Sequence, residues 1–459
     1  MQVIQPFDGA LIAEIAADDA AALEAKIERA AAAFARRDAW LPKSERIAVL
    51  RRLAKLLERE REALALLIAR EGGKPLADAR VETARAILGV ELSASAIEGL
   101  AGQEIPMGIS SASAGRWAFT THEPIGVVAA ISAFNHPLNL IVHQAAPAIA
   151  AGCPVIVKPA DVTPLCAARF VALAHEAGLP EDYCQLAVLE DVSLAQKLAT
   201  DPRVALLSFI GSARVGWKLR SLLSPGTRVA LEHGGAAPLI VDRNVDLDAL
   251  IEPIVKGGYY HAGQVCVSTQ RIFVHEAVVE AFLSRFVARV GALKVGDPTQ
   301  AETEVGPLIR PREVERVTQW VDEALAGGAQ IPVGGSALGT RMFAPTVVVE
   351  PPPEARLSRE EVFGPVTCVY AYRDLDEAIA RANALPLAFQ ASVFTRDLAV
   401  AMRAASRLDA SAVMINDHTA FRTDWMPFAG RKQSGYGIGG IPYTLHDMLQ
   451  AKMIVLNGV

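Results

Sequence analysis

The stretch Val127-Val128-Ala129-Ala130-Ile131-Ser132 decides the fold, because it opens a regular series of strand and helix patterns. A short apolar run that ends in a turn is typical of a strand buried on both faces. The patterns that follow are, in chain order, residues 138–150 (helix), 154–158 (strand), 163–177 (helix), 185–189 (strand), a helix to about 199, 204–209 (strand), a helix from 213, and 228–232 (strand). This alternation predicts an α/β fold with a doubly wound parallel sheet, which binds ligands beyond the carboxyl ends of its strands.

The same region invites a membrane interpretation, because residues 124–157 contain no Asp, Glu, Lys or Arg. Four prolines and polar residues such as Asn135 and Asn139 interrupt this run. A membrane-spanning helix needs about 20 predominantly apolar residues. Two buried strands flanking a buried helix therefore explain the run better.

The rest of the chain continues outward from this core. The first hundred residues have helical patterns, with a second helix that begins near Ser44 and a break at Gly72-Gly73-Lys74-Pro75. Residues 103–122 are typical of a hairpin arm that stands off the body. After Gly235 a second α/β pattern begins, with strands expected at 238–241, 272–274, 347–349, 368–372, 391–394 and 412–415, and a last strand at 452–456. We expect no long linker and no tandem repeat.

Size and composition limit the class of protein. A chain of 459 residues predicts two or three domains, and a net charge of −6 with interspersed signs argues against a nucleic-acid surface. The five cysteines form no CxxC pair, so we expect neither a disulfide framework nor a metal site, and a cytoplasmic location fits best. The first 19 residues lack the basic start and apolar core of a signal peptide.

Four groups of residues at strand ends indicate chemistry. After the first strand comes Ser132-Ala133-Phe134-Asn135-His136-Pro137, whose Asn135 is either an oxyanion donor or a plain turn residue. Lys158 and Asp161 follow the next strand and are placed either to bind a nucleotide ribose or to start a helix.

The third group, residues 209–216, is a strand, a glycine turn and a helix start, which suits a pyrophosphate but is equally typical of a structural turn. The fourth group is Glu360-Glu361-Val362-Phe363-Gly364-Pro365. Considered alone, it is a pair of charged residues before a turn.

Cys266, within Gly263-Gln264-Val265-Cys266, and Glu232, within Leu231-Glu232-His233-Gly234-Gly235, complete the set. A nucleophilic cysteine needs an exposed, partly ionised thiol and a carboxylate that moves protons without repelling the thiolate. Taken alone, a single cysteine is more often buried packing. The other four cysteines lie in apolar strand or helix contexts and are expected to be inert.

Together and in this order, these segments resemble the aldehyde dehydrogenase superfamily. The resemblance covers nearly the whole chain and extends through residues 293–298, 361–365 and 427–430. It implies NAD(P)-dependent oxidation of an aldehyde to a carboxylic acid. By this resemblance Cys266 is the nucleophile, Asn135 an oxyanion donor and Glu232 the base that activates water.

The resemblance also implies the cofactor contacts and the domains. Residues implied to contact the cofactor are Ser132, Phe134, Lys158, Asp161, Gly211, Ser212, Val215, Glu361 and Phe363. Residues 1–102 and 123–234 would form a Rossmann-like NAD-binding domain and 235–425 a catalytic domain. Residues 103–122 and 441–459 would form an oligomerisation arm, which implies a homodimer or homotetramer.

Departures from the family pattern leave the substrate open. Phe134 stands where Trp is common, His136 follows Asn135, and His233, where Leu is common, is expected to pack or form a hydrogen bond away from Glu232. Arg422 and His136 are candidate contacts for an anionic substrate tail, as in family members acting on semialdehydes, phosphonoacetaldehyde or phosphoglyceraldehyde. The alternative for Arg422 is a surface pair with Asp424.

The Asp161 carboxylate would repel a 2′-phosphate, so we expect NAD rather than NADP. Three rival functions remain: an acylating enzyme that uses coenzyme A, a non-catalytic binding or structural protein on the same fold, and a thiol hydrolase. The presence of Glu232 disfavours the first, the complete set of site residues disfavours the second, and the lack of an evident His partner for Cys266 disfavours the third.

Overall fold

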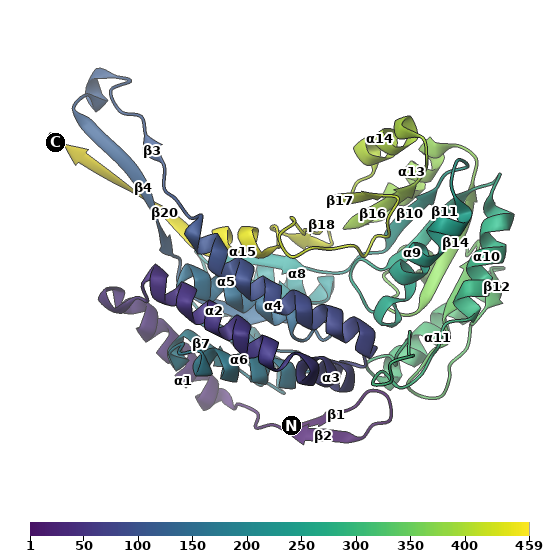
Figure 1. Cartoon of the computed structure of the whole chain (residues 1–459), viewed down its shortest axis with the longest axis horizontal. Helices are drawn as coiled ribbons and strands as arrows, with labels where there is room; N and C mark the ends of the chain where they lie inside the picture. Colours follow the sequence, from purple (N-terminus) through teal and green to yellow (C-terminus); the bar gives the residue numbers. More distant parts are fainter. Residues whose placement is uncertain (459) are drawn as a thin grey trace.

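The computed structural model describes residues 1–458, which form two lobes and a projecting arm (Figure 1). A six-stranded sheet lies at the centre of the first lobe. Its strands are, in sheet order, β19 (Gly435–Tyr436), β9 (Arg228–Glu232), β8 (Val204–Ile210), β5 (Val127–Ile131), β6 (Val155–Lys158) and β7 (Cys184–Leu186). The five strands β5 to β9 are parallel, and β19 pairs antiparallel with β9.

The strand order of this sheet fixes where a ligand binds. Numbered along the chain, the parallel strands stand in the order 3-2-1-4-5, which is the order of a dinucleotide-binding Rossmann sheet. The order reverses between β5 and β8, and the crevice beyond their carboxyl ends is the usual site for a nucleotide. The α/β fold expected from the sequence is confirmed.

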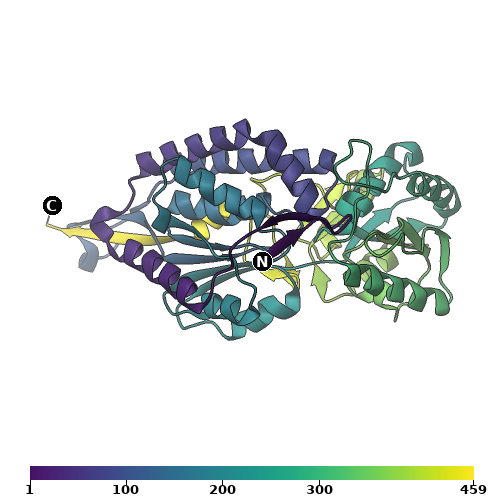
Figure 2. The same ribbon diagram turned by 90° about the horizontal axis from the view of Figure 1, so that it is seen from below.

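Helices cover both faces of the first sheet, as Figure 2 shows from below. One face carries α2 (Lys43–Arg59), α3 (Arg61–Gly72), α4 (Leu76–Glu98), α5 (Asn139–Ala151) and α6 (Leu165–Glu176); the other carries α1 (Ala20–Ala35), α7 (Val192–Thr200) and α8 (Ala213–Ser221). Because side chains alternate along a strand, Val128 and Ala130 of β5 belong to the first core and Val127 and Ala129 to the second.

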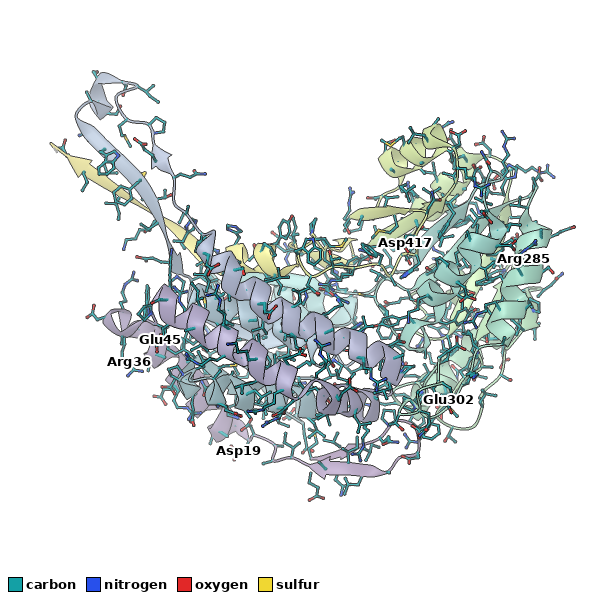
Figure 3. All side chains as sticks on the ribbon, in the orientation of Figure 1. Asp19, Arg36, Glu45, Arg285, Glu302 and Asp417 are labelled. Carbon is teal, nitrogen blue, oxygen red and sulfur yellow. The ribbon has the colours of Figure 1, made fainter. Side chains whose placement is uncertain are left out.

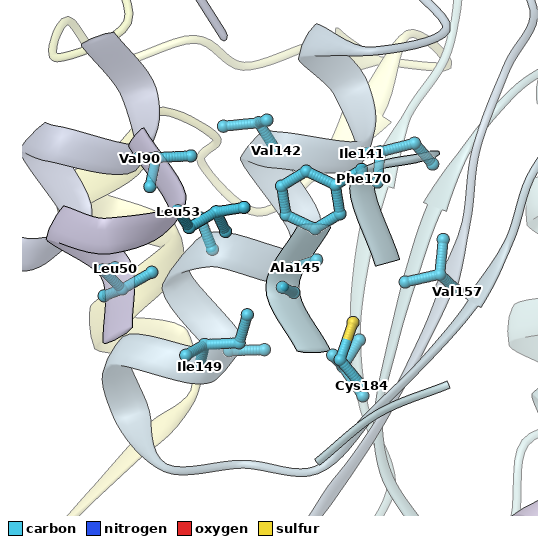
Figure 4. Close-up of a cluster of buried hydrophobic side chains, with 14 of the residues drawn as sticks. Leu50, Leu53, Val90, Ile141, Val142, Ala145, Ile149, Val157, Phe170 and Cys184 are labelled. Carbon is cyan, nitrogen blue, oxygen red and sulfur yellow. The ribbon is translucent and has the colours of Figure 1, made fainter. Parts of the chain in front are cut away.

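The core between α2, α4, α5 and α6 holds the segment that follows β5. Figure 4 shows Leu53, Val142, Ala145 and Phe170 meeting there, and all four are buried. Truncating a buried Phe such as Phe170 to Ala typically costs about 3–5 kcal/mol. This packing accounts for the apolar run over residues 124–157, and among residues 1–458 no helix is long and apolar enough to cross a membrane.

The second lobe is built on a seven-stranded sheet. Its strands are, in order, β12 (Gln330–Val333), β13 (Thr346–Val349), β14 (Val366–Tyr372), β11 (Thr269–His275), β10 (Ala237–Val241), β16 (Gln390–Phe394) and β17 (Ala412–Ile415). Its helices are α9 (Leu247–Tyr259), α10 (Val279–Gly291), α11 (Pro311–Ala326), α13 (Leu375–Asn383) and α14 (Leu398–Arg407). All strand pairs are parallel except β12–β13. Charged side chains such as Asp19, Glu45 and Arg285 lie on the outside of the two lobes (Figure 3).

The arm is a three-stranded antiparallel sheet that projects from the first lobe (Figure 1). It consists of β3 (Glu104–Ile105), β4 (Arg116–Pro124) and β20 (Leu449–Asn457). The expectation that the arm begins again at residue 441 is wrong, because α15 (Ile441–Asp447) packs against α4 and α5 in the body. Val459, the last residue of the expected arm, lies outside the described residues.

Several elements were not expected from the sequence. The strands β1 (Gln2–Ile4) and β2 (Leu11–Glu14) form an N-terminal hairpin in a region expected to be helical, and α9 and β12 lack a prediction altogether. The second helix does begin near Ser44, since α2 begins at Lys43 and Pro42 precedes it. The two strands of the hairpin have only three and four residues, too few for an apolar period to stand out.

Candidate functional site

The two distant turns expected to carry the chemistry meet between the lobes. Glu232 is the last residue of β9, and Cys266 lies in the loop before β11. The Cys266 Sγ–H points to Glu232 Oε1 at 3.9 Å. Cys266 is the one cysteine of the five that is partly exposed, and none forms a disulfide. The interpretation of the other four as inert, buried thiols therefore fits the structure.

Burial and charge place the proton on the sulfur in this state. Burial raises the pKa of the Cys266 thiol well above its usual range, and the nearby Glu232 carboxylate raises it further. Burial also raises the pKa of Glu232, although Arg422 and Arg85 oppose this shift. The sequence-based requirement that the carboxylate should not repel the thiolate is thus not met here. Glu232 is placed instead to take the proton from a thiol or from water.

The turn before Cys266 requires an unusual backbone. His261 and Ala262 have φ of 49° and 55°, and Gly263 has φ of 70°. A Cβ at Gly263 would lie 2.1 Å from the Gly364 carbonyl oxygen, so only glycine fits there. Backbone strain of this kind costs about 1–3 kcal/mol per residue and is concentrated at functional sites.

Asn135 lies beside the same loop. Its buried Nδ2 donates to the Gln264 carbonyl at 2.9 Å, which uses one of its two N–H groups. The helix that follows, α5, is fixed at its start by the buried Glu82 carboxylate, which accepts the N–H groups of Leu138 and Asn139 at 3.0 and 3.1 Å. Lys74, from the Gly72-Gly73-Lys74-Pro75 break, pairs with Glu82. The second N–H of Asn135 is available for a developing oxyanion.

Arg422 points into the site rather than to the surface. Its side chain is 10% exposed, its Nη1 lies 4.0 Å from Glu232 Oε1, and its guanidinium stacks 3.5 Å from the centre of the Phe428 ring. The alternative of a surface pair with Asp424 is wrong. Asp424 is buried and accepts Arg85 Nη2 and His143 Nε2, each at 2.7 Å, and Asn139 Nδ2 at 3.2 Å.

The protonation of His143 follows from these contacts. Arg422 Nη2 lies 3.4 Å from His143 Nδ1, and a guanidinium can only donate. Nδ1 is therefore the acceptor, and Nε2–H donates to Asp424. Burial, and next Arg422, lower the pKa of His143 to about 4, which agrees with a neutral ring. Neither Arg85 nor His143 was singled out as a site residue from the sequence, because each is an ordinary residue inside a helix.

His136 cannot supply positive charge. Burial and the neighbouring Lys74 and Arg85 lower its pKa well below its usual range. Its Nε2 lies 3.3 Å from the Tyr260 hydroxyl. His136 is thus a neutral hydrogen-bonding residue near the expected position, and the cationic part of the predicted anion contact rests on Arg422.

His233 has a structural role, as its strand position suggested. The ring packs against Phe209 and Trp217, with ring centres 6.0 and 5.5 Å away, and Nδ1 is 3.0 Å from the Gln433 carbonyl. Val265, the residue before Cys266, packs with Val267, Phe389 and Phe428. A cavity of about 40 Å³ borders Glu232 and Arg422 and gives room for water beside the base.

The residues expected to contact a dinucleotide lie at the carboxyl ends of β5, β6 and β8. Ser132 and Phe134 follow β5, Lys158 ends β6 with Asp161 three residues beyond it, and Gly211 and Ser212 connect β8 to α8, which contains Val215. The Ser132 hydroxyl is buried without a partner, and Ser212 makes no side-chain cap, so N–H groups at the start of α8 are free for an anion. These groups fit a dinucleotide.

Glu361 and Phe363 approach the same crevice from the second lobe. The Phe363 ring meets the edge of Phe134, with ring centres 5.9 Å apart, and Glu361 Oε1 accepts the Gly235 N–H at 3.1 Å. Burial raises the pKa of Glu361 to about 8. A Cβ at Gly234 would lie 1.8 Å from Glu361 Oε2, which explains the glycine beside the base.

The model of the aldehyde dehydrogenase family matches residues 1–454. The chain belongs to the aldehyde dehydrogenase family. Among its relatives, 3-sulfolactaldehyde dehydrogenase from Priestia aryabhattai is 38% identical over 414 residues, which cover 90% of this chain and 86% of the relative. The match and its coverage show an oxidoreductase that acts on aldehydes, and similar solved structures that contain NADP or are NAD-dependent support a nicotinamide cofactor.

Solved structures agree with this assignment. The chain superimposes with a TM-score of 0.96 on aldehyde dehydrogenase 21 from Physcomitrella patens in complex with its reaction product succinate, at 35% identity, covering 100% of this chain and 95% of the other. Glyceraldehyde-3-phosphate dehydrogenase from Methanocaldococcus jannaschii complexed with NADP gives a TM-score of 0.95 at 32% identity, covering 100% and 99%. Among residues 1–458 of this aldehyde dehydrogenase, no group of three or more His, Cys, Asp or Glu side chains is placed to hold a metal ion.

Proposed function

We propose that this enzyme oxidises a small aldehyde bearing an anionic group to its carboxylic acid by a hydrolytic route, with NAD as cofactor. The observation that carries the reaction type is the approach of Cys266 Sγ to within 3.9 Å of Glu232 Oε1 beside Asn135. In this proposal the first lobe binds the cofactor and the second lobe supplies the nucleophile.

The side chains perform the chemistry in two stages. The Cys266 sulfur attacks the aldehyde carbon while Glu232 accepts the thiol proton, and Asn135 Nδ2 and the Cys266 N–H donate to the oxyanion. The nicotinamide, when bound, supplies the hydride acceptor that turns the thiohemiacetal into a thioester. Once Glu232 has released the thiol proton to solvent, it removes a proton from water, whose oxygen attacks the thioester. The acid is released, and the departing Cys266 thiolate takes that proton back from Glu232.

The proposed substrate class rests on the unsatisfied charge of Arg422. Its Nε is buried without a partner, and among residues 1–458 the only carboxylate within 4.0 Å of the guanidinium is that of Glu232, at that limit. A buried charge without a close partner is costly, so an anion at this place is strongly favoured. Asp424 cannot fill this role because Arg85 and His143 occupy it. The names of the relatives, which include a sulfolactaldehyde dehydrogenase and an aspartate-semialdehyde dehydrogenase, support an anionic aldehyde.

The experiment is a screen for NADH release with small aldehydes that carry anionic or neutral tails; succinate semialdehyde and butyraldehyde are the pair matched in chain length. Succinate semialdehyde and 3-sulfolactaldehyde are expected to be oxidised, with a neutral butyraldehyde at least about tenfold worse in kcat/KM. Cys266→Ala is the matched inactive control. Coenzyme A added to the same assay is expected to yield no acyl-CoA; its formation would replace the hydrolytic route with the acylating one. Absence of NADH with every aldehyde would refute the proposal and favour a binding protein.

We further propose that the arm joins two copies of the chain. β20 is an edge strand of nine residues, and Met453 and Val455 on it are 55% and 43% exposed. Long exposed apolar edges are covered in most natural proteins. Light scattering is expected to show a dimer or tetramer that a chain lacking residues 449–459 does not form. The five free cysteines suit a reducing compartment, and we propose the cytoplasm.

A further inference from the structure

An ion pair joins the two lobes at the mouth of the proposed cofactor crevice. Arg310 Nη2 donates to Asp161 Oδ2, and the side chains are 31% and 52% exposed. Asp161 belongs to the first lobe, three residues after β6, whereas Arg310 is the residue immediately before α11 in the second. Sequence reasoning could not find this pair, because its members are 149 positions apart.

The position of Asp161 in the sheet relates the Arg310–Asp161 pair to cofactor binding. β6 lies next to β5, the first strand of the Rossmann order. In such sheets an acidic residue after the second strand binds the ribose hydroxyls of NAD, and an arginine nearby accommodates the 2′-phosphate of NADP. Here both residue types are present, as Asp161 and Arg310, and they form an ion pair with each other. The expectation of NAD rather than NADP rested on the charge of the Asp161 carboxylate, with no account of Arg310 beside it.

Arg310 is held at this position by the loop of the nucleophile. The N–H of the preceding residue, Ile309, donates to Gln264 Oε1 at 3.0 Å, and Gln264 Nε2 donates to the Pro307 carbonyl at 3.2 Å. The backbone on the N-terminal side of Arg310 is therefore fixed, and the first turn of the 16-residue helix α11 adds partial positive charge.

Lys158 supplies a second cation at the same strand end. It is the last residue of β6 and partly buried, and no carboxylate lies within 4 Å of it among residues 1–458. Lys158 and Arg310 each carry +1 and Asp161 carries −1, so the three side chains sum to +1. An additional anionic group is therefore attracted rather than repelled at this end of the crevice.

We propose that Arg310 is a specificity-determining residue that lets the enzyme bind NADP as well as NAD. Asp161 accepts from the ribose hydroxyls of NAD, and Arg310 with Lys158 donates to the 2′-phosphate of NADP. This inference rests on the proposed function, since it assumes that the crevice of the first lobe holds the dinucleotide. It goes beyond that function because the second lobe then takes part in choosing the cofactor.

The test measures binding by calorimetry, without turnover, on the full chain. The probes are NAD, NADP and the fragments ADP and 2′,5′-ADP, which differ by the 2′-phosphate alone. Arg310→Gln is expected to lower the affinity for NADP and 2′,5′-ADP by about tenfold, the usual effect of losing one charge-assisted hydrogen bond. The affinity for NAD and ADP is expected to change by less than about twofold. Arg310→Lys, which keeps the charge, is expected to retain part of the NADP affinity.

The matched control is Arg312→Gln. Arg312 is an exposed residue in the first turn of the same helix and pairs with its neighbour Glu313, so its loss is expected to leave the NADP to NAD ratio unchanged. A wild-type enzyme that binds NAD but not NADP, or an Arg310→Gln variant with an unchanged ratio, would overturn the inference while leaving the proposed function intact. Failure of both dinucleotides to bind would overturn the proposed function itself.

Discussion

Replacing Arg422 with Leu tests whether one buried guanidinium selects anionic aldehydes. Leu is apolar and fits beside the Phe428 ring, which Arg422 now covers at 3.5 Å. A charge-assisted hydrogen bond to a buried guanidinium is worth about 1.5–3 kcal/mol, and each 1.4 kcal/mol is about tenfold in binding. The variant should therefore lose about ten- to hundredfold in kcat/KM for an anionic aldehyde and keep its kcat/KM for a neutral one of the same length.

The same change has a second, independent consequence at the base. Arg422 lowers the pKa of Glu232 against the effect of burial, so its removal is expected to raise that pKa. The acidic limb of the pH–rate profile should move to higher pH, because Glu232 must be deprotonated to act as a base. His143 loses its donor but keeps its bond to Asp424, so the fold is expected to survive.

The assay compares the ratio of kcat/KM for an anionic aldehyde to kcat/KM for a neutral aldehyde of the same length. It is measured for wild type, Arg422→Leu and a surface control, Arg312→Leu, and circular dichroism confirms that each variant is folded. Equal losses for anionic and neutral aldehydes would show that Arg422 only supports the structure. An unchanged preference would remove Arg422 from substrate recognition.

Three further predictions follow from the geometry. Glu232→Gln should leave a burst of one NADH per active site and slow steady turnover by about 10²- to 10⁴-fold, since the base is needed for the water step; loss of the burst as well would assign Glu232 mainly to thiol activation. Burial raises the pKa of Glu361 to about 8, so between about pH 4.5 and 8 the folded state holds a proton that the unfolded state has released. The free energy of unfolding therefore falls as the pH rises through this window. Urea titrations of Glu361→Gln should show a smaller fall in the free energy of unfolding than wild type, and an unchanged fall would contradict the raised pKa. Gly216→Ala would place a Cβ 2.0 Å from His233 Nε2 and should lower the free energy of unfolding, measured by urea titration, by about 1–3 kcal/mol. Gly99→Ala, whose Cβ would have its closest neighbour at 3.9 Å, should lower it little. Equal losses of stability would mean that the His233 ring moves aside.

The sequence by itself determined the fold class and the order of the motifs. Strands such as residues 127–131 and 412–415 are short apolar runs, and this pattern is a local property that needs no partner. Cys266 and Glu232 could also be proposed from the sequence, because each lies close to glycines in a recognisable motif. The hairpin of β1 and β2 and the start of α15 escaped prediction because short elements and boundaries are set by tertiary contacts.

Only the tertiary structure decided the charges around those motifs. On sequence grounds Arg422 was either a surface partner of Asp424 or a substrate contact. The structure excludes the surface pair, because Arg85 of α4 and His143 of α5 contact Asp424 instead. The sequence showed the Asp161 carboxylate, and only the tertiary structure showed that Arg310 of the other lobe forms an ion pair with it. The physical reason is the same in both cases: the effect of a charge depends on its partners and burial, and these come from residues over a hundred positions away.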